Sequence, residues 1–140
     1  MGLKILHNPR CSKSRQTLAI LSENRIDVDI IEYLKDVPSK ETLKKIINIL
    51  GIKPRDLLRK GEVVYKENNL GREDLTDDDL IQFMLDNPIL IERPIVYDDK
   101  RAVIGRPPDN VLKLIKWSRK VKISTINNQN DIESLEIWVI

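Results

Sequence analysis

The sequence of 140 residues is poor in the residue types that build metal sites and disulfide frameworks. It has one cysteine, Cys11, and one histidine, His7, which excludes an internal disulfide and a multi-cysteine zinc site, so we expect no bound metal. It also lacks long apolar runs, since residues 88–91 fall far short of the roughly 20 residues of a membrane-spanning helix. Residues 1–7 lack the pattern of a secretory signal. We therefore expect a cytoplasmic protein that does not contact a membrane.

The composition is that of a globular chain with one domain, with 41% hydrophobic and 33% charged residues. The net charge of +2 is too small to indicate a nucleic-acid-binding protein. The charges are nevertheless unevenly distributed, with 14 basic and 9 acidic residues in residues 1–70, against 10 and 13 in residues 71–140. Cys11 lies in the basic half, which suits a small anionic substrate better than a polyanion.

The first part of the chain predicts a strand–helix–strand unit. Residues 3–6 form a short apolar run closed by Asn8 and Pro9, which indicates a buried strand followed by a turn. Residues 12–24 have a helical composition, and the β-branched residues 28–31 indicate a second strand. The intervening helix makes the two strands parallel. The helix is expected to bury an apolar stripe of Leu18, Ala19, Ile20 and Leu21.

The middle of the chain is predicted to be mostly helical. One helix is expected to begin after Ser39 and to end at Gly51, a residue type that often terminates helices. Its apolar positions follow helical spacing, at Leu43, Ile46, Ile47 and Leu50. Residues 54–87 should add a helical turn over 56–60 and a helix near the end of this segment. Thr76 followed by Asp79 predicts the N-cap of that helix.

The last part of the chain predicts two strands, a helix and a tail. Residues 95–97 and 102–104 are spaced as an antiparallel hairpin, and a helix is expected over residues 109–119. The polar segment 124–131 is a candidate linker, and residues 135–140 are apolar enough either to cover the core or to contact a partner. The sequence leaves these two possibilities open.

The order of these elements predicts an α/β fold with a thioredoxin/glutaredoxin-like mixed sheet. A helical insertion of about residues 38–87 separates the second strand from the third. We expect one domain over residues 1–118 and a tail of unknown role over residues 119–140.

Cys11 is the first candidate for chemistry because it falls at the junction between the first strand and the first helix. The unsatisfied N–H groups and the dipole at a helix N-terminus favour the thiolate over the thiol, and the same position favours oxyanions. Arg10, Lys13 and Arg15 add positive charge, and Arg15 stands one helical turn beyond Cys11. His7 is either an ordinary strand-end residue or a participant in the site.

The spacing around Cys11 excludes two well-known thiol sites. Ser14 stands where a Cys-x-x-Cys motif would have its second cysteine, so an outside thiol must complete any redox turnover. Thr17 stands where a Cys-x5-Arg phosphatase loop would have its arginine. The spacing here is Cys-x3-Arg.

The pattern His-x3-Cys-x3-Arg at His7, Cys11 and Arg15 resembles the active-site motif of the glutaredoxin-dependent arsenate reductase family. Three further segments agree with that family in order and spacing: Leu-Leu-Arg-Lys over residues 57–60, Pro-Ile-Leu-Ile-Glu-Arg-Pro-Ile-Val over residues 88–96, and Gly-Arg-Pro over residues 105–107. The resemblance extends over about residues 3–116. It does not include the segment from Trp117 onwards.

The resemblance implies roles for particular residues. Cys11 would attack arsenate, and Arg59, Arg93 and Arg106 would hold the oxyanion, for which arginine offers permanently charged, forked donors. His7, Ser14 and Arg15 would support the thiolate. Pro94 would be the cis proline that thioredoxin-like folds place opposite the cysteine.

The resemblance also implies how the reaction is completed. Glutathione, as co-substrate, would add to the thiol–arsenate, and glutaredoxin would reduce the mixed species and release arsenite. No cofactor would be bound, no nucleic acid would be involved, and we expect a monomer.

Two other functions fit the same scaffold. A glutathione-dependent thiol/disulfide reductase would keep Cys11 but would have less need of the three arginines together. A regulator resembling Spx, which binds RNA polymerase, usually senses oxidation through Cys-x-x-Cys, and Ser14 counts against it.

Overall fold

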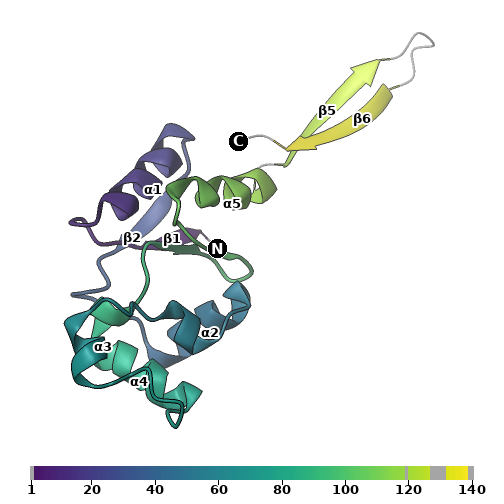
Figure 1. The fold of residues 1–140 in the computed structure, drawn as a ribbon. Coiled ribbons are helices and arrows are strands. Elements are labelled where there is room, and N and C mark those ends of the chain that lie inside the picture. Colours follow the sequence, from purple (N-terminus) through teal and green to yellow (C-terminus); the bar gives the residue numbers. More distant parts are fainter. Residues whose placement is uncertain (1, 119, 127–131, 139–140) are drawn as a thin grey trace.

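The computed structural model of the chain describes residues 2–118, 120–126 and 132–138. Its centre is a four-stranded mixed sheet in the order β2-β1-β3-β4 (Figure 1). Strand β1 (Leu3–Leu6) pairs in parallel with β2 (Val28–Ile31) and antiparallel with β3 (Ile95–Tyr97), which in turn pairs antiparallel with β4 (Ala102–Ile104). Both the parallel pair and the hairpin predicted from the sequence are confirmed.

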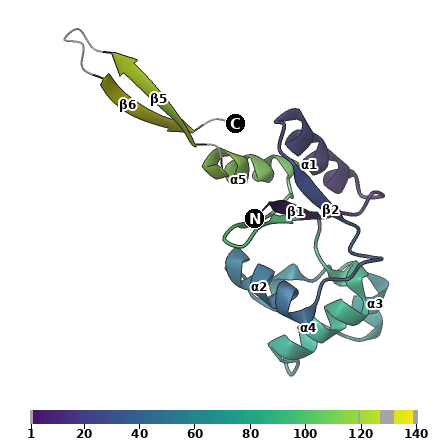
Figure 2. The same ribbon diagram turned by 180° about the vertical axis from the view of Figure 1, so that it is seen from behind.

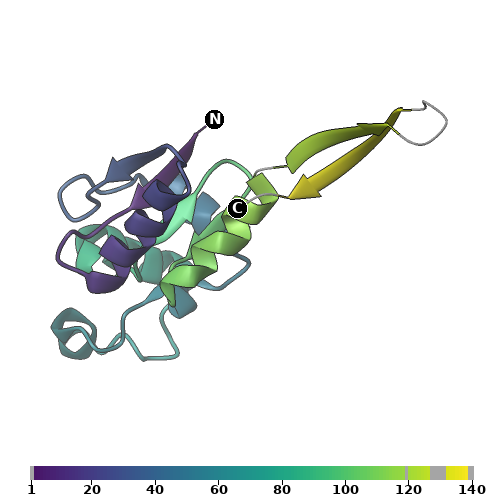
Figure 3. The same ribbon diagram turned by 90° about the horizontal axis from the view of Figure 1, so that it is seen from above.

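Helices cover both faces of this sheet. Helices α1 (Ser12–Glu23) and α5 (Val111–Ser118) lie side by side on one face (Figure 3). The inserted helices lie on the other face, as the view from behind also shows (Figure 2). Alternation along β1 separates the two cores, because Leu3 and Ile5 pack with the first layer and Leu6 with the second. This is the thioredoxin-like fold expected from the sequence.

The buried face of α1 differs from the predicted apolar stripe. Leu21 is fully buried, but Ala19 is exposed, while Leu18 and Ile20 are only half-buried. The remaining buried positions of the helix are polar, at Ser14 and Thr17. The prediction is wrong for Ala19, whereas Leu18 and Ile20 pack against the core beside Leu21 as predicted.

Helix α2 (Lys40–Leu50) begins and ends as the sequence predicted. The Ser39 side chain accepts a hydrogen bond from the Thr42 N–H, which satisfies one free donor of the first turn. Gly51 adopts a left-handed conformation with φ of 69°, which a residue without Cβ takes without strain.

Residues 54–87 are mostly helical, as predicted, and contain one short helix, α3, that the sequence did not predict. A 3₁₀ helix spans Pro54–Leu57, α3 spans Val63–Glu67 and α4 spans Asp77–Asp86. The predicted turn over residues 56–60 is misplaced. The helical turn ends at Leu57, and the next residue pairs with residue 91 across an antiparallel bridge.

The start of α4 is as predicted. Thr76 accepts a hydrogen bond from the Asp79 N–H, and the Asp79 carboxylate accepts one from the Thr76 N–H. A second 3₁₀ helix, Pro88–Leu90, leads from α4 toward β3.

A 3₁₀ helix, Pro108–Asn110, precedes α5, so the last helix of the domain begins close to the predicted residue 109. Strands β5 (Lys120–Ile126) and β6 (Ile132–Trp138) then form an antiparallel hairpin that projects from the end of α5 (Figure 3). The predicted linker is wrong for residues 124–126, which belong to β5. Residues 127–131 and 139–140 lie outside the described residues.

Within the described ranges, none of the helices is long and apolar enough to cross a membrane.

Candidate active site

Cys11 lies between the end of β1 and the start of α1 and is 8% exposed. Its N–H donates to the Asn8 carbonyl at 3.0 Å, and its carbonyl accepts from the Arg15 N–H at 3.0 Å. It is therefore the N-cap residue of α1, and its side chain makes no capping hydrogen bond. The thiol thus lies at the N-terminal end of α1, where a helix has N–H groups without intrahelical partners.

Ser14 and His7 form a buried pair beneath the loop that carries Cys11. Ser14 Oγ accepts from the Asn8 N–H at 3.0 Å and lies 2.6 Å from His7 Nδ1. Burial lowers the pKa of His7; the Glu32 carboxylate opposes this effect and the positive charge of Arg15 adds to it. The tautomer of the His7 ring sets which of the two groups, Nδ1 or the Ser14 hydroxyl, donates in this hydrogen bond.

Arg15 contacts the same loop from outside. Its Nη1 donates to the Pro9 carbonyl at 2.9 Å, on the turn that precedes Cys11. The structure thus places the three residues expected to support the thiolate around the Cys11 loop. Their described hydrogen bonds hold the loop and the start of the helix, and their effect on the thiolate stays a prediction.

Main-chain hydrogen bonds between residues 57–59 and residues 90–92 fix the position of Arg59. The Arg59 N–H donates to the Leu90 carbonyl at 2.8 Å, and the Glu92 N–H donates to the Leu57 carbonyl at 2.9 Å. These hydrogen bonds bring Arg59 beside the segment that leads into β3. That segment carries Glu92 and Arg93.

The loop after β4 brings Arg106 to the same place. The Gly105 N–H donates to the Pro94 carbonyl at 2.9 Å, and Arg106 Nη1 donates to the Arg93 carbonyl at 3.3 Å. The peptide bond before Pro94 is cis, as the resemblance implied, and the bond before Pro107 is also cis, which the sequence analysis did not anticipate. The main chain therefore brings Arg59, Arg93 and Arg106 together.

Two glutamates that the sequence analysis missed pair with these arginines. Arg59 Nη1 lies 2.5 Å from Glu62 Oε1, and Glu92 Oε1 lies 3.4 Å from Arg106 Nε and 3.9 Å from Arg59 Nε. Within the described residues, the buried Nε and Nη1 atoms of Arg93 have no hydrogen-bond partner. A glutamate three residues after an arginine was the only local signal, and it pointed to Glu62 alone.

The charges of Arg59 and Cys11 both affect the pKa of Tyr33. It is fully buried, and its Oη has no hydrogen-bond partner among the described residues. Burial raises the pKa of Tyr33 well above its usual range; the charge of Arg59 opposes this shift, while Cys11, Glu92 and Glu62 add to it.

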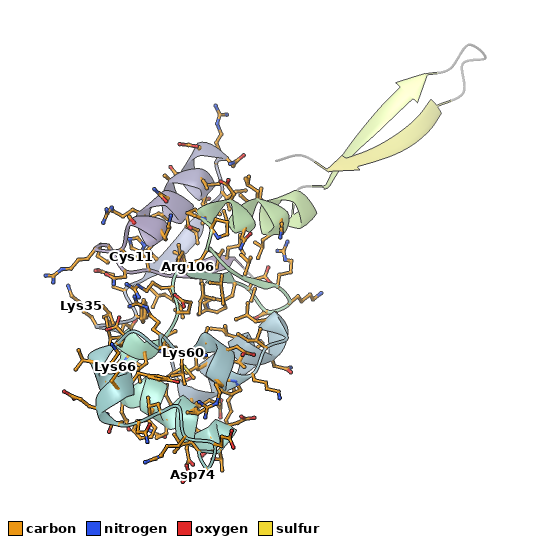
Figure 4. All side chains as sticks on the ribbon, viewed as in Figure 1. Cys11, Lys35, Lys60, Lys66, Asp74 and Arg106 are labelled. Atoms are coloured by element: carbon orange, nitrogen blue, oxygen red, sulfur yellow. The ribbon has the colours of Figure 1, made fainter. Side chains whose placement is uncertain are left out.

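Figure 4 shows Cys11 beside the start of α1 and Arg106 near it in this view, with Lys35 and Lys60 closer to the inserted helices. A cavity of about 930 Å³ lies elsewhere, lined by residues of the turn at Asp98, of β4 and of α5. Within the part of the chain that the structure describes, no cluster of three or more His, Cys, Asp or Glu side chains could hold a metal.

Comparison with known proteins gives consistent matches over the whole sheet and its helices. The model of the ArsC family matches residues 6–114. The uncharacterized protein YfgD of Escherichia coli K12 is 47% identical over 114 residues, covering 81% of this chain and 96% of that protein. An arsenate reductase of Escherichia coli is 37% identical over 132 residues, 94% of each chain. The solved structure of an arsenate reductase from Vibrio cholerae has a TM-score of 0.78 at 47% identity, covering 81% of this chain and 97% of that one.

Proposed function

This chain belongs to the ArsC family, and we propose that it is an arsenate reductase in which Cys11 is the nucleophile. The observation that carries the proposal is that the main chain brings Arg59, Arg93 and Arg106 together at the end of the sheet where β1 leads to Cys11. Several arginines offer forked, permanently charged donors to a tetrahedral oxyanion and stabilise charge in the transition state. Arg93 is the clearest candidate, because its buried Nε and Nη1 are without a partner among the described residues.

The proposed reaction begins when the Cys11 thiolate attacks arsenic, forming a sulfur–arsenic bond and expelling one oxygen as water. Glutathione then adds to the thiol–arsenate and expels a second oxygen as water. A glutaredoxin thiol attacks the glutathione sulfur, which forms a glutathione–glutaredoxin disulfide and leaves arsenic(III) on Cys11. Water hydrolyses the remaining sulfur–arsenic bond, which releases arsenite and restores the Cys11 thiol. In sum, arsenic(V) accepts two electrons, two thiols become one disulfide, and one water is formed.

The reducing equivalents in this scheme come from outside the chain, because Cys11 is its only cysteine. We therefore propose glutathione as co-substrate and glutaredoxin as partner, with no bound cofactor and with the protein acting as a monomer. We place the reaction in the cytoplasm, where glutathione is kept reduced.

The test is a coupled assay that follows NADPH oxidation with arsenate, glutathione, glutaredoxin and glutathione reductase. Cys11→Ser is the blank, and its near-wild-type size should leave the fold unchanged. We expect arsenate-dependent turnover in the wild type and none in the blank. Thioredoxin with thioredoxin reductase, substituted for the glutathione components, tests the choice of electron donor.

A second substrate separates the proposal from the disulfide-reductase alternative. A glutathione mixed disulfide replaces arsenate in the same assay. Turnover of the mixed disulfide through Cys11, with none of arsenate, would overturn the proposal and favour a glutathione-dependent thiol reductase.

A further inference from the structure

Glu92 occupies a central position among the proposed oxyanion-binding groups. Its Oε1 lies 3.4 Å from Arg106 Nε and 3.9 Å from Arg59 Nε, so one carboxylate oxygen is shared by two of the three arginines. Its side chain is 27% exposed, and those of Arg59 and Arg106 are 21% and 38% exposed. The group is thus partly shielded from water and still reachable by a small ion.

The main chain holds Glu92 in this place. Its N–H donates to the Leu57 carbonyl at 2.9 Å, and the adjacent residues Leu58 and Ile91 pair across an antiparallel bridge. Glu92 also directly precedes Arg93 and the cis peptide bond. Its carboxylate therefore faces the arginines because the backbone brings it there.

A carboxylate and a tetrahedral oxyanion make the same kind of contact with arginine. Both present negatively charged oxygens to N–H donors. An oxyanion that binds Arg59 and Arg106 together must displace the oxygen they already share. It would otherwise lie against a second negative charge, which is unfavourable in a partly buried site.

We infer that Glu92 is an internal competitor of the substrate, a carboxylate that holds Arg59 and Arg106 in the absence of an oxyanion and gives way when one binds. The inference rests on the proposed function and concerns substrate affinity. Glu92 limits how tightly small anions bind, so that an ion must engage several arginines at once to displace it.

The experiment measures binding of inorganic sulfate, a tetrahedral oxyanion that this chemistry does not reduce. Sulfate protection of Cys11 against alkylation by iodoacetamide reports occupancy, at constant ionic strength maintained with chloride. We expect Glu92→Gln, which keeps the size and removes the charge, to lower the apparent Kd for sulfate about two- to fivefold, the change that corresponds to a partly exposed ion pair. The KM for arsenate should fall in the same direction.

Two control variants isolate the effect. Glu73→Gln removes one negative charge from an exposed position and should leave the sulfate Kd unchanged. Glu62→Gln removes the partner of Arg59 alone and should lower the Kd by less than Glu92→Gln.

Whether the sulfate Kd falls or rises in Glu92→Gln decides the inference. If Glu92 only orients the arginines, Glu92→Gln will weaken sulfate binding or leave it unchanged, and the inference is overturned while the oxyanion site stands. If sulfate does not protect Cys11 even in the wild type, the proposed oxyanion site fails and the inference fails with it.

Discussion

Ser14 Oγ and His7 Nδ1 lie 2.6 Å apart in the interior of the protein, beneath the loop that carries Cys11. The same hydroxyl accepts from the Asn8 N–H, so one side chain satisfies two buried groups. This explains why a polar side chain occupies a buried position of α1. It also means that Ser14 does more in this chain than occupy the position of a missing second cysteine.

Replacing Ser14 with alanine should therefore destabilise the fold. Ser14→Ala leaves the Asn8 N–H and His7 Nδ1 buried without their partner, which typically costs about 1–3 kcal/mol. Urea unfolding followed by circular dichroism measures the change. Ser22→Ala, at an exposed position of the same helix, is the matched control and should change stability by less than about 0.5 kcal/mol. Equal losses in the two variants would show that the buried pair contributes nothing specific.

His7 should make the stability of the protein depend on pH. Burial lowers its pKa from the ordinary value of 6.5, so the unfolded chain binds a proton before the folded one as the pH falls. The contribution of His7 to the free energy of unfolding is fully present well above pH 6.5 and is lost as the pH falls below 6.5 toward the lowered pKa of the folded state. We expect the urea midpoint to fall between pH 7.5 and pH 5.5, and to fall less in His7→Gln. Because His7 is the only histidine, identical pH dependence in both proteins would contradict the expectation.

Gly105 should not tolerate alanine, because the chain is packed closely there. A Cβ at this position would stand 2.4 Å from Thr17 Oγ1 and 2.8 Å from Pro94 Cγ, and both of those residues are buried. We expect Gly105→Ala to lower the free energy of unfolding by about 1–3 kcal/mol, the usual range for overpacking. Gly61→Ala is the control, since a Cβ there has no atom within 4 Å. Similar thermal midpoints for the two variants would refute the close packing.

Arg93 should be required for its geometry as well as its charge. Arg93→Lys keeps the charge but loses the fork of donors, so kcat/KM for arsenate should fall about 10- to 100-fold. The free energy of unfolding should change little, because the buried Nε and Nη1 lack hydrogen-bond partners among the described residues. Arg72→Lys, at an exposed position, should retain wild-type activity. Full activity in Arg93→Lys would remove Arg93 from the oxyanion site.

Local signals account for the parts of the fold that were predicted. The Thr76 and Asp79 pair and the Ser39 and Gly51 boundaries depend on hydrogen bonds and backbone angles within a few residues. The apolar run of residues 3–6 likewise marked β1 locally. The strands of the tail were missed because an antiparallel hairpin depends on pairing between two segments, and residues 124–126 of β5 were counted with the polar segment that follows them.

By itself, the sequence determined the order of most strands and helices up to α5 and the place of Cys11 at a helix N-terminus, and its resemblance to a family predicts the role of the three arginines. Only the tertiary structure decided that Glu92 lies between Arg59 and Arg106 and that Tyr33 is fully buried. The physical reason is that these neighbours are brought together by backbone pairing between distant segments. Such pairing depends on the whole sheet and leaves no periodic or spacing signal around any one of these residues.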